Sequence, residues 1–323
     1  MNHFDKESNL PETENLHIHL AISPAKEKGG SSAMALPPDT TPAPQPFTPG
    51  MSSQDDAPAP TSSAVPAQPN GKPTSEETKP EDKEPDSSSP TAFKPPRLRL
   101  HVQEIGHPGA SIFLTSVNAA TILQQSIKAI HKHLYTGPIT PSSTSSPQST
   151  HLHPPPTRSV TLILRPMDGV AYTTGSDLDS DHKEIHFSLR YISGISPSSR
   201  YSSEITGVVV HELVHCYQWN GSGTAPGGLI EGVADWVRLQ SNLAPPHWDR
   251  GAVPGRWDVG YQGTAYFLEY LEGRFGEGVV RRLNEKLRKE RYEEVAFWTE
   301  LVGWPVERLF EDYKKTLEEK SKE

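Results

Sequence analysis

The stretch VVVHELVHCYQW, residues 208–219, is the part of the sequence around which the fold is organised. Within it His211 and His215 are four residues apart, and the positions beside and between them are almost all apolar. Because a residue in an α-helix advances by about 100°, two residues four apart project from nearly the same face, one turn apart. Two neutral imidazoles at this spacing can share one divalent cation, so the stretch predicts a helix that carries a metal site.

Glu212 completes an HExxH pattern and lies about 100° around the helix from His211. That is too far round for a comfortable third ligand, but it suits a contact with a water on the metal. In metalloproteases with this pattern the two histidines bind zinc and the glutamate acts as general base. A pattern this short also recurs by accident. The alternative is an amphipathic helix whose histidines are surface residues or core residues with satisfied hydrogen bonds.

A second helix is predicted over GGLIEGVADWVR, residues 227–238, and it offers a further ligand. Catalytic zinc normally has three protein ligands, which leaves one to be found. Glu231 follows His215 by 16 residues, enough for the first helix to end and the chain to return alongside it. Gly221 suits the turn after the first helix, and Pro226 suits the first turn of the second.

Asp235 lies four residues after Glu231 and therefore one turn further along the same face. A histidine that binds a metal usually donates its other N–H to a carboxylate, which fixes its tautomer and raises its basicity. The sequence thus predicts His211, His215 and Glu231 as zinc ligands and Asp235 as the carboxylate that orients a ligand histidine. Asp235 is also the alternative third ligand, since aspartate can take that place.

The order of these motifs resembles known protein families. HExxH followed by a Glu-xxx-Asp helix is similar to the gluzincins, the thermolysin-type zincins, in which this pattern carries the third ligand and the orienting Asp. More closely, HELVHCYQWNGSGTAPGGLIEGVADWVRL (211–239), WDVGYQGTAYFLEYLE (257–272) and MDGVAYTTG (167–175) resemble the plant basic secretory protein family, also described as peptidases of plants and bacteria. The resemblance covers roughly residues 97–317. It implies a zinc-dependent, peptidase-like domain, associated in plants with defence secretions.

Composition separates an N-terminal tail from a folded domain. Residues 1–94 hold 16 of the 32 prolines and carry 14 acidic against 7 basic residues, with no sustained helical or strand period. Such a segment buries too little apolar surface to offset its ordering entropy, so we expect a disordered tail. Residues 95–320 form the predicted zincin-like domain, with a low-complexity loop insertion at 136–157. Because the tail accounts for most of the net charge of −9, the domain carries no charge pattern that indicates nucleic-acid binding.

Targeting features are not evident in the sequence. The first residues lack a basic segment followed by an apolar one, and no apolar run is long enough to span a membrane. The single cysteine, Cys216, excludes disulfides within the chain and is expected to be a buried core thiol. These features favour a cytoplasmic location or leave the compartment open, although the resembling family is often secreted.

The periodicity of apolar residues in the rest of the domain predicts an α+β fold, and the resemblance implies that this fold is zincin-like. It has a small, mostly antiparallel sheet, followed by the HExxH helix and a C-terminal helical region. The strand closest in sequence to the HExxH helix is expected at the edge or in the interior of the sheet. The predicted strands are 97–105, 158–167, 170–175 and 183–192, and the other predicted helices are 116–134, 258–273, 277–289, 290–303 and 305–319.

The function predicted from these features is a zinc-dependent metallopeptidase, an endopeptidase acting on peptide or protein substrates. Glu212 is the expected general base, and Tyr261 is the expected hydrogen-bond donor to the developing oxyanion, with Tyr217 and Tyr266 as weaker candidates. Core packing is an equally good interpretation of each tyrosine. Two alternatives remain, a non-catalytic interaction protein that keeps the zincin fold and a zinc hydrolase of a non-peptide amide or ester. The sequence leaves the oligomeric state open.

Overall fold

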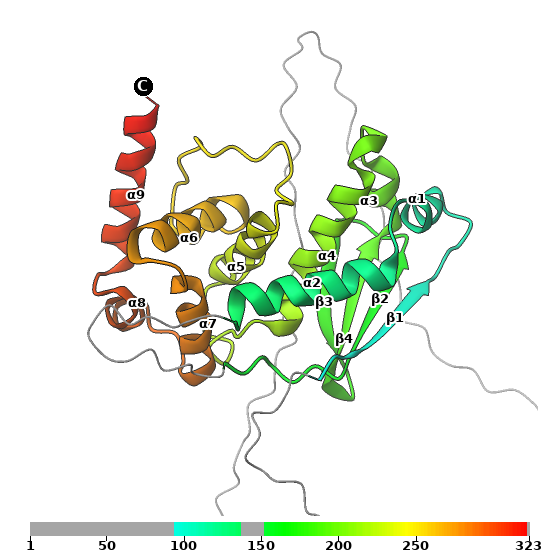
Figure 1. Ribbon diagram of the computed structural model, residues 1–323, viewed down its shortest axis with the longest axis horizontal. Helices are drawn as coiled ribbons and strands as arrows, with labels where there is room; N and C mark the ends of the chain where they lie inside the picture. Colours follow the sequence, from blue (N-terminus) through cyan, green and yellow to red (C-terminus); the bar gives the residue numbers. More distant parts are fainter. Residues whose placement is uncertain (1–93, 137–151, 322–323) are drawn as a thin grey trace, which may run out of the picture. The chain divides into compact units, whose positions relative to one another are not determined.

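The computed structural model describes residues 94–136 and 152–321 (Figure 1). Nearly all of the predicted tail and most of the predicted insertion, residues 137–151, lie outside the described residues. None of the helices in the described ranges combines the length and apolarity needed to cross a bilayer. The elements in chain order are β1 (Arg97–Val102), α1 (Pro108–Ser116), α2 (Ala119–Leu134), β2 (Ser159–Arg165), β3 (Ala171–Ser176), β4 (Asp179–Ser188), α3 (Leu189–Gly194), η1 (Ser198–Arg200), α4 (Tyr201–Tyr217), α5 (Gly227–Gln240), α6 (Tyr261–Phe275), α7 (Val279–Lys289), α8 (Glu294–Val302) and α9 (Val306–Lys320).

The four strands form one mixed sheet in the order β1-β2-β4-β3. β1 pairs with β2 and β2 with β4 in parallel, and only β3 runs antiparallel to its neighbour β4. The prediction of a mostly antiparallel sheet is therefore wrong, while the α+β class with a small sheet is confirmed. Strand β4 lies inside the sheet, and β1 and β3 form its two edges.

The parallel pairing follows from the connection between the first two strands. Parallel neighbours need a crossover of a dozen or more residues, usually helical, and α1 and α2 supply it between β1 and β2. In the sequence this crossover is hard to recognise, because a low-complexity stretch separates its second helix from β2. β3 and β4 are joined by only two residues and form a hairpin, so they are necessarily antiparallel.

Two predicted elements have different bounds in the structure, because a polar side chain caps the start of a helix within each of them. The predicted strand at 183–192 ends at Ser188, whose hydroxyl accepts a hydrogen bond from the Tyr191 backbone N–H, and α3 begins at the next residue. The predicted helix at 116–134 begins at Ala119, because the Asn118 side chain accepts from the Thr121 N–H. A separate helix, α1, precedes it and starts at a proline, which suits a first helical position.

Helix α4 is the central element of the domain. It packs against α1, α2 and α5 and against strands β3 and β4. In Figure 1 the sheet lies on one side of α4, and the C-terminal helices α6–α9 lie beyond α5 on the other. Because α4 is surrounded, almost every residue from Glu204 onward is buried, including Cys216, as expected for a core thiol. The C-terminal helical region is confirmed, with α6–α9 close to their predicted ranges.

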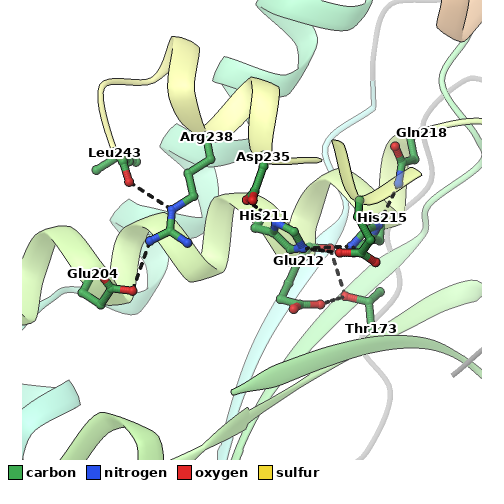
Figure 2. A network of polar contacts seen from close by, with 10 residues as sticks. Thr173, Glu204, His211, Glu212, His215, Gln218, Asp235, Arg238 and Leu243 are labelled. Carbon is green, nitrogen blue, oxygen red and sulfur yellow. Dashed lines mark hydrogen bonds and ion pairs between the residues drawn. The ribbon is translucent and has the colours of Figure 1, made fainter. Parts of the chain in front are cut away.

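A buried ion pair joins α4 to α5. Glu204 and Arg238 are each nearly inaccessible, and Arg238 Nη2 donates to Glu204 Oε1 over 3.1 Å (Figure 2). Gly207 leaves the space that the guanidinium occupies, since a Cβ there would lie 2.6 Å from Arg238 Nε. Burial acts to raise the pKa of Glu204, but Arg238, the Tyr191 hydroxyl and Arg200 outweigh it, so the pKa lies below its usual value.

We predict that Glu204→Gln lowers the free energy of unfolding at pH 7 by about 3–5 kcal/mol, because it leaves the buried Arg238 charge without its counter-charge. Since the pKa of Glu204 is lowered in the folded state, its stabilisation is fully present above the unfolded pKa of about 4.3. It is lost as the pH falls through the folded value. Urea unfolding of wild type and variant between pH 7 and pH 3 measures both effects.

Glu269→Gln is the matched control, since Glu269 pairs with Arg250 near the surface and should contribute less than about 1 kcal/mol. Equal losses in the two variants, or a difference between wild type and Glu204→Gln that grows on acidification, would contradict the assignment.

Candidate metal centre

Helices α4 and α5 bring two histidines and two carboxylates together at their interface (Figure 2). His211 is fully buried, and the side chains of His215, Glu231 and Asp235 are each less than one-tenth exposed. On both helices the polar residues are spaced so that they share one face within an otherwise apolar sequence. The two helices thus meet along a polar seam.

The candidate ligand atoms converge on one point. One atom each from His211, His215 and Glu231 can be chosen so that all lie within 4.8 Å of one another. The two Nε2 atoms are 3.2 Å apart, and Glu231 Oε2 lies 3.1 Å from His211 Nε2. The other oxygen, Oε1, lies 3.7 Å from His215 Nε2.

These separations suit a tetrahedral zinc ion. With Zn–N bonds of about 2.0–2.1 Å, two nitrogen ligands of a tetrahedral ion are about 3.3–3.4 Å apart. Among the described residues none donates a hydrogen bond to Glu231 Oε1, although this atom is buried. A buried carboxylate oxygen without a donor, beside two imidazole nitrogens that face each other, is an arrangement that a cation satisfies. Imidazole and carboxylate are also ligands that zinc accepts.

Asp235 occupies a different place from Glu231. Its Oδ1 lies 2.7 Å from His211 Nδ1, on the far side of the ring from the three converging atoms. An Nδ1–H that donates to Asp235 leaves the lone pair of His211 on Nε2, directed toward His215 and Glu231. The geometry thus places the two carboxylates differently, with Glu231 among the converging candidate ligand atoms and Asp235 at the opposite nitrogen of the His211 imidazole.

The carboxylates determine the electrostatics of the cluster. Burial alone would lower the pKa of His211, but Asp235 and Glu231 outweigh burial and raise it to about 10. At His215 burial dominates and lowers the pKa to about 4. Burial acts to raise the pKa of Glu231, yet the two histidines bring it below its usual value. Around His211 the two carboxylates therefore favour a positive charge, whether this is a proton or a metal cation.

Gln218 contacts the second histidine and was not predicted from the sequence. Its Nε2 is placed 2.7 Å from His215 Nδ1, while its buried Oε1 has no hydrogen-bond partner among the described residues. With the amide turned by 180°, the Gln218 oxygen would accept from an Nδ1–H of His215, and Nε2 of His215 would keep its lone pair for a cation. Helical spacing gave no indication of this contact, since α4 ends at Tyr217.

Glu212 lies beside the cluster and points toward the sheet. Its side chain is almost fully buried, and the Thr173 hydroxyl of strand β3 lies 2.6 Å from Glu212 Oε2 (Figure 2). Burial raises the pKa of Glu212 to about 7, against the opposing effects of His211 and the Thr173 hydroxyl. A carboxyl group with such a pKa can both take up and release a proton near neutral pH. Thr173 is a second contact that the sequence did not indicate.

Of the three candidate tyrosines, the structure brings Tyr261 to the cluster. Its ring lies nearly parallel to that of His211, with centroids 6.5 Å apart. The rings of Tyr217 and Tyr266 instead pack against His131 and Trp248, respectively.

Tyr261 begins α6 with a φ of 47°, an unusual value for a bulky residue. Close packing of the preceding backbone on α5 holds it there. A Cβ on Gly228 would lie 1.8 Å from the Asp258 carbonyl oxygen, and one on Gly232 would lie 2.2 Å from Thr264 Cγ2. The glycines of α5 therefore allow the start of α6 to approach the polar seam. Strain of this kind is common at functional sites, where the surrounding structure maintains it.

The comparison with known families agrees with the resemblance noted in the sequence. The model of a family described as peptidase of plants and bacteria matches residues 95–313, which include both helices of the seam, strand β3 and Tyr261. No curated protein and no solved structure matches the chain. The family match spans more than half of the 323 residues. The chain therefore belongs to the family of peptidases of plants and bacteria.

Proposed function

We propose that the protein is a zinc-dependent metallopeptidase that cleaves within peptide or protein substrates. The observation that carries the proposal is the convergence of ligand atoms from His211, His215 and Glu231, with the Glu212 carboxyl group beside them in a buried site. The family description supports peptide substrates. Zinc, when bound, supplies a Lewis acid that polarises a carbonyl and makes water a nucleophile near neutral pH.

The residues of the polar seam would have two different roles in binding the ion, as ligands and as groups that orient the ligands. His211, His215 and Glu231 would provide three ligand atoms, the number of protein ligands usual in catalytic zinc sites. Asp235 accepts the Nδ1–H of His211, and the Gln218 amide, turned so that its oxygen faces His215 Nδ1, would do the same for the second imidazole. Both Nε2 lone pairs would then be available to the ion. This divided arrangement is similar to that of the gluzincins, the subgroup to which we assign the chain.

Glu212 is the proposed general base. It stands outside the set of ligand atoms, and its raised pKa suits a group that takes a proton from water and passes it to the leaving amine. Tyr261 is the proposed second donor to the oxyanion, because its ring lies beside the His211 ring at the start of α6. Glu212 is held by Thr173 of strand β3, and Tyr261 begins helix α6, which packs on α5.

Strand β3 offers a place for an extended substrate. It is an edge strand of the sheet, and its residue Thr173 contacts Glu212. The unpaired main-chain groups of an edge strand can pair with an extended peptide, which would set a peptide bond near the general base. This mode of binding suits an endopeptidase, because it requires neither end of the substrate chain.

We predict that Glu212→Gln lowers the rate of peptide cleavage by about 10²–10⁴-fold, the usual contribution of a general base, while zinc binding is retained. The measurement is mass spectrometry of new peptide termini after a proteome-derived peptide mixture has been incubated with the zinc-loaded full chain, wild type or variant. The residues around the new termini would also report the preference for neighbouring side chains.

Equal cleavage by the two proteins would contradict the role of Glu212. Absence of cleavage by the wild type would point to a non-catalytic interaction protein or to a hydrolase of other amides or esters, which assays with small amide and ester substrates would then distinguish.

The assignment of the third ligand predicts different metal affinities for two neighbouring variants. Glu231→Ala should leave the site without zinc after dialysis, because a ligand is lost, whereas Asp235→Ala should weaken zinc binding only about 10–100-fold. Zinc content by mass spectrometry and competition with a chelator measure the two affinities, with Glu212→Gln as the control that keeps its metal. Retention of zinc by Glu231→Ala together with its loss from Asp235→Ala would exchange the two roles.

Tyr261→Phe tests the oxyanion donor. We expect kcat to fall by about 10²-fold with little change in KM, because the hydroxyl would act only on charge that develops in the transition state. Tyr266→Phe is the matched control, since its ring packs against Trp248 and beneath the Arg250 guanidinium. A rise in KM at constant kcat, or equal effects of the two variants, would instead indicate that Tyr261 serves packing or substrate binding.

A further inference from the structure

Strand β3 is attached to the Glu212 residue at two points. The Thr173 hydroxyl oxygen lies 2.6 Å from Glu212 Oε2 and 3.0 Å from the Glu212 backbone carbonyl oxygen. Thr173 and Glu212 are separated by 39 positions in the sequence, and both are buried. A single side chain of the edge strand therefore contacts both the main chain and the carboxylate of one residue on α4.

The hydroxyl is itself held firmly in place. Thr173 pairs with Ile185 of β4 in the antiparallel ladder, and the side chain of Ile185 is fully buried. A threonine side chain is stiff at its first torsion, because two heavy atoms branch from Cβ. A short hydrogen bond to a carboxylate is among the stronger ones, particularly where water is excluded. Backbone pairing, a stiff side chain and burial together fix the oxygen that faces Glu212.

This contact matters because a glutamate side chain is otherwise flexible. Three side-chain torsions of Glu212 must be fixed for the carboxylate to stay beside the ligand atoms, and the helix fixes only the position of its Cα and Cβ atoms. The proposed ligand histidines use their Nδ1 atoms for contacts with other residues, His211 with Asp235 and His215 with Gln218. Thr173 therefore supplies the restraint on the Glu212 carboxylate that the other residues of the polar seam do not supply.

We infer that Thr173 is a positioning residue that holds the Glu212 carboxylate in its working orientation and thereby couples the edge strand of the sheet to the general base. The inference rests on the function proposed above, and it assigns to β3 a role in catalysis separate from any pairing with substrate. Both hydrogen bonds of the Thr173 hydroxyl go to Glu212, so the residue acts through Glu212.

The experiment compares Thr173→Val, which removes the hydroxyl at nearly constant volume, with Thr173→Ser, which keeps it. With labelled casein as the probe and the zinc-loaded full chain, Thr173→Val should lower kcat by about 10–100-fold at unchanged KM and zinc content. Thr173→Ser should restore most of the activity. In a Glu212→Gln background the same Thr173→Val change should have no further effect, because the group it positions is no longer a base.

Thr174→Val is the matched control, since within the described part of the chain this neighbouring hydroxyl bonds to the adjacent Gly175 carbonyl oxygen and not to Glu212. If Thr173→Val fails to fold, as judged by circular dichroism, Thr173→Ala replaces it in the comparison with Thr173→Ser. Full activity in the folded hydroxyl-free variant, or an equal loss in Thr174→Val, would overturn the inference. So would a further loss in the Glu212→Gln background.

A second readout does not depend on activity. In metal-free protein labelled with ¹³C at the glutamate carboxyl carbons, the Glu212 resonance is identified by its loss in Glu212→Gln. Thr173→Val should shift or broaden this resonance, while Thr173→Ser and Thr174→Val should leave it nearly unchanged. If wild type cleaves no casein, the proposed function fails in that assay, yet the resonance still decides whether Thr173 orients Glu212. An unshifted resonance in Thr173→Val would sink the inference even in an active enzyme.

Discussion

The packing of α4 against α5 along a row of buried charges is the constraint on which the rest of the structure depends. Glu204 faces Arg238 at one end of the row, His211 faces Asp235 in its middle, and Glu231 faces the two histidines at the other end. The contacts run in opposite order along the two helices, as they must in an antiparallel pair. Each buried charge would be costly alone, so the row is stable only when all partners meet.

This row also fixes the register of the two helices. Sliding one helix by a turn would separate the buried Glu204 from Arg238 and would leave their charges without partners in the core. Apolar side chains around the seam tolerate such shifts far better, because hydrophobic contact is not directional. The Glu204–Arg238 pair at one end of the row therefore helps to fix the positions of the candidate ligand atoms at the other end, with the precision that a metal site requires. Stability and the proposed chemistry depend on the same interface.

Helical spacing alone puts His211 and His215 on one face of α4, and Glu231 and Asp235 on one face of α5, so each of these two pairs could be predicted from the sequence. Contacts between distant segments could not be predicted, since no local period links a strand residue such as Thr173 to a helix 39 positions later. Gln218 lies just beyond the end of its helix, where the helical rule no longer applies.

The sheet shows the same limit at the level of the fold. Alternation predicted strands close to the observed ones, but it carries no information on strand order or on the direction of pairing. The parallel arrangement follows from the helical crossover between β1 and β2, half of which, α1, has too little amphipathic pattern to be recognised from its sequence. Ser188 similarly ends β4 through a side-chain cap and not through any change in apolar alternation.

The proposed catalytic groups are held beside the polar seam by contacts different from those that build it. Glu212 is held by a hydrogen bond from the sheet, and Tyr261 is held by backbone packing that the glycines of α5 allow. The packing of α4 against α5 alone would thus suffice to bring the three candidate ligand atoms together. The proposed general base and the proposed oxyanion donor also require the sheet and α6 to be packed in place. Ligand affinity and catalytic rate should accordingly respond to different substitutions, since the first depends on one helix pair and the second on the whole domain.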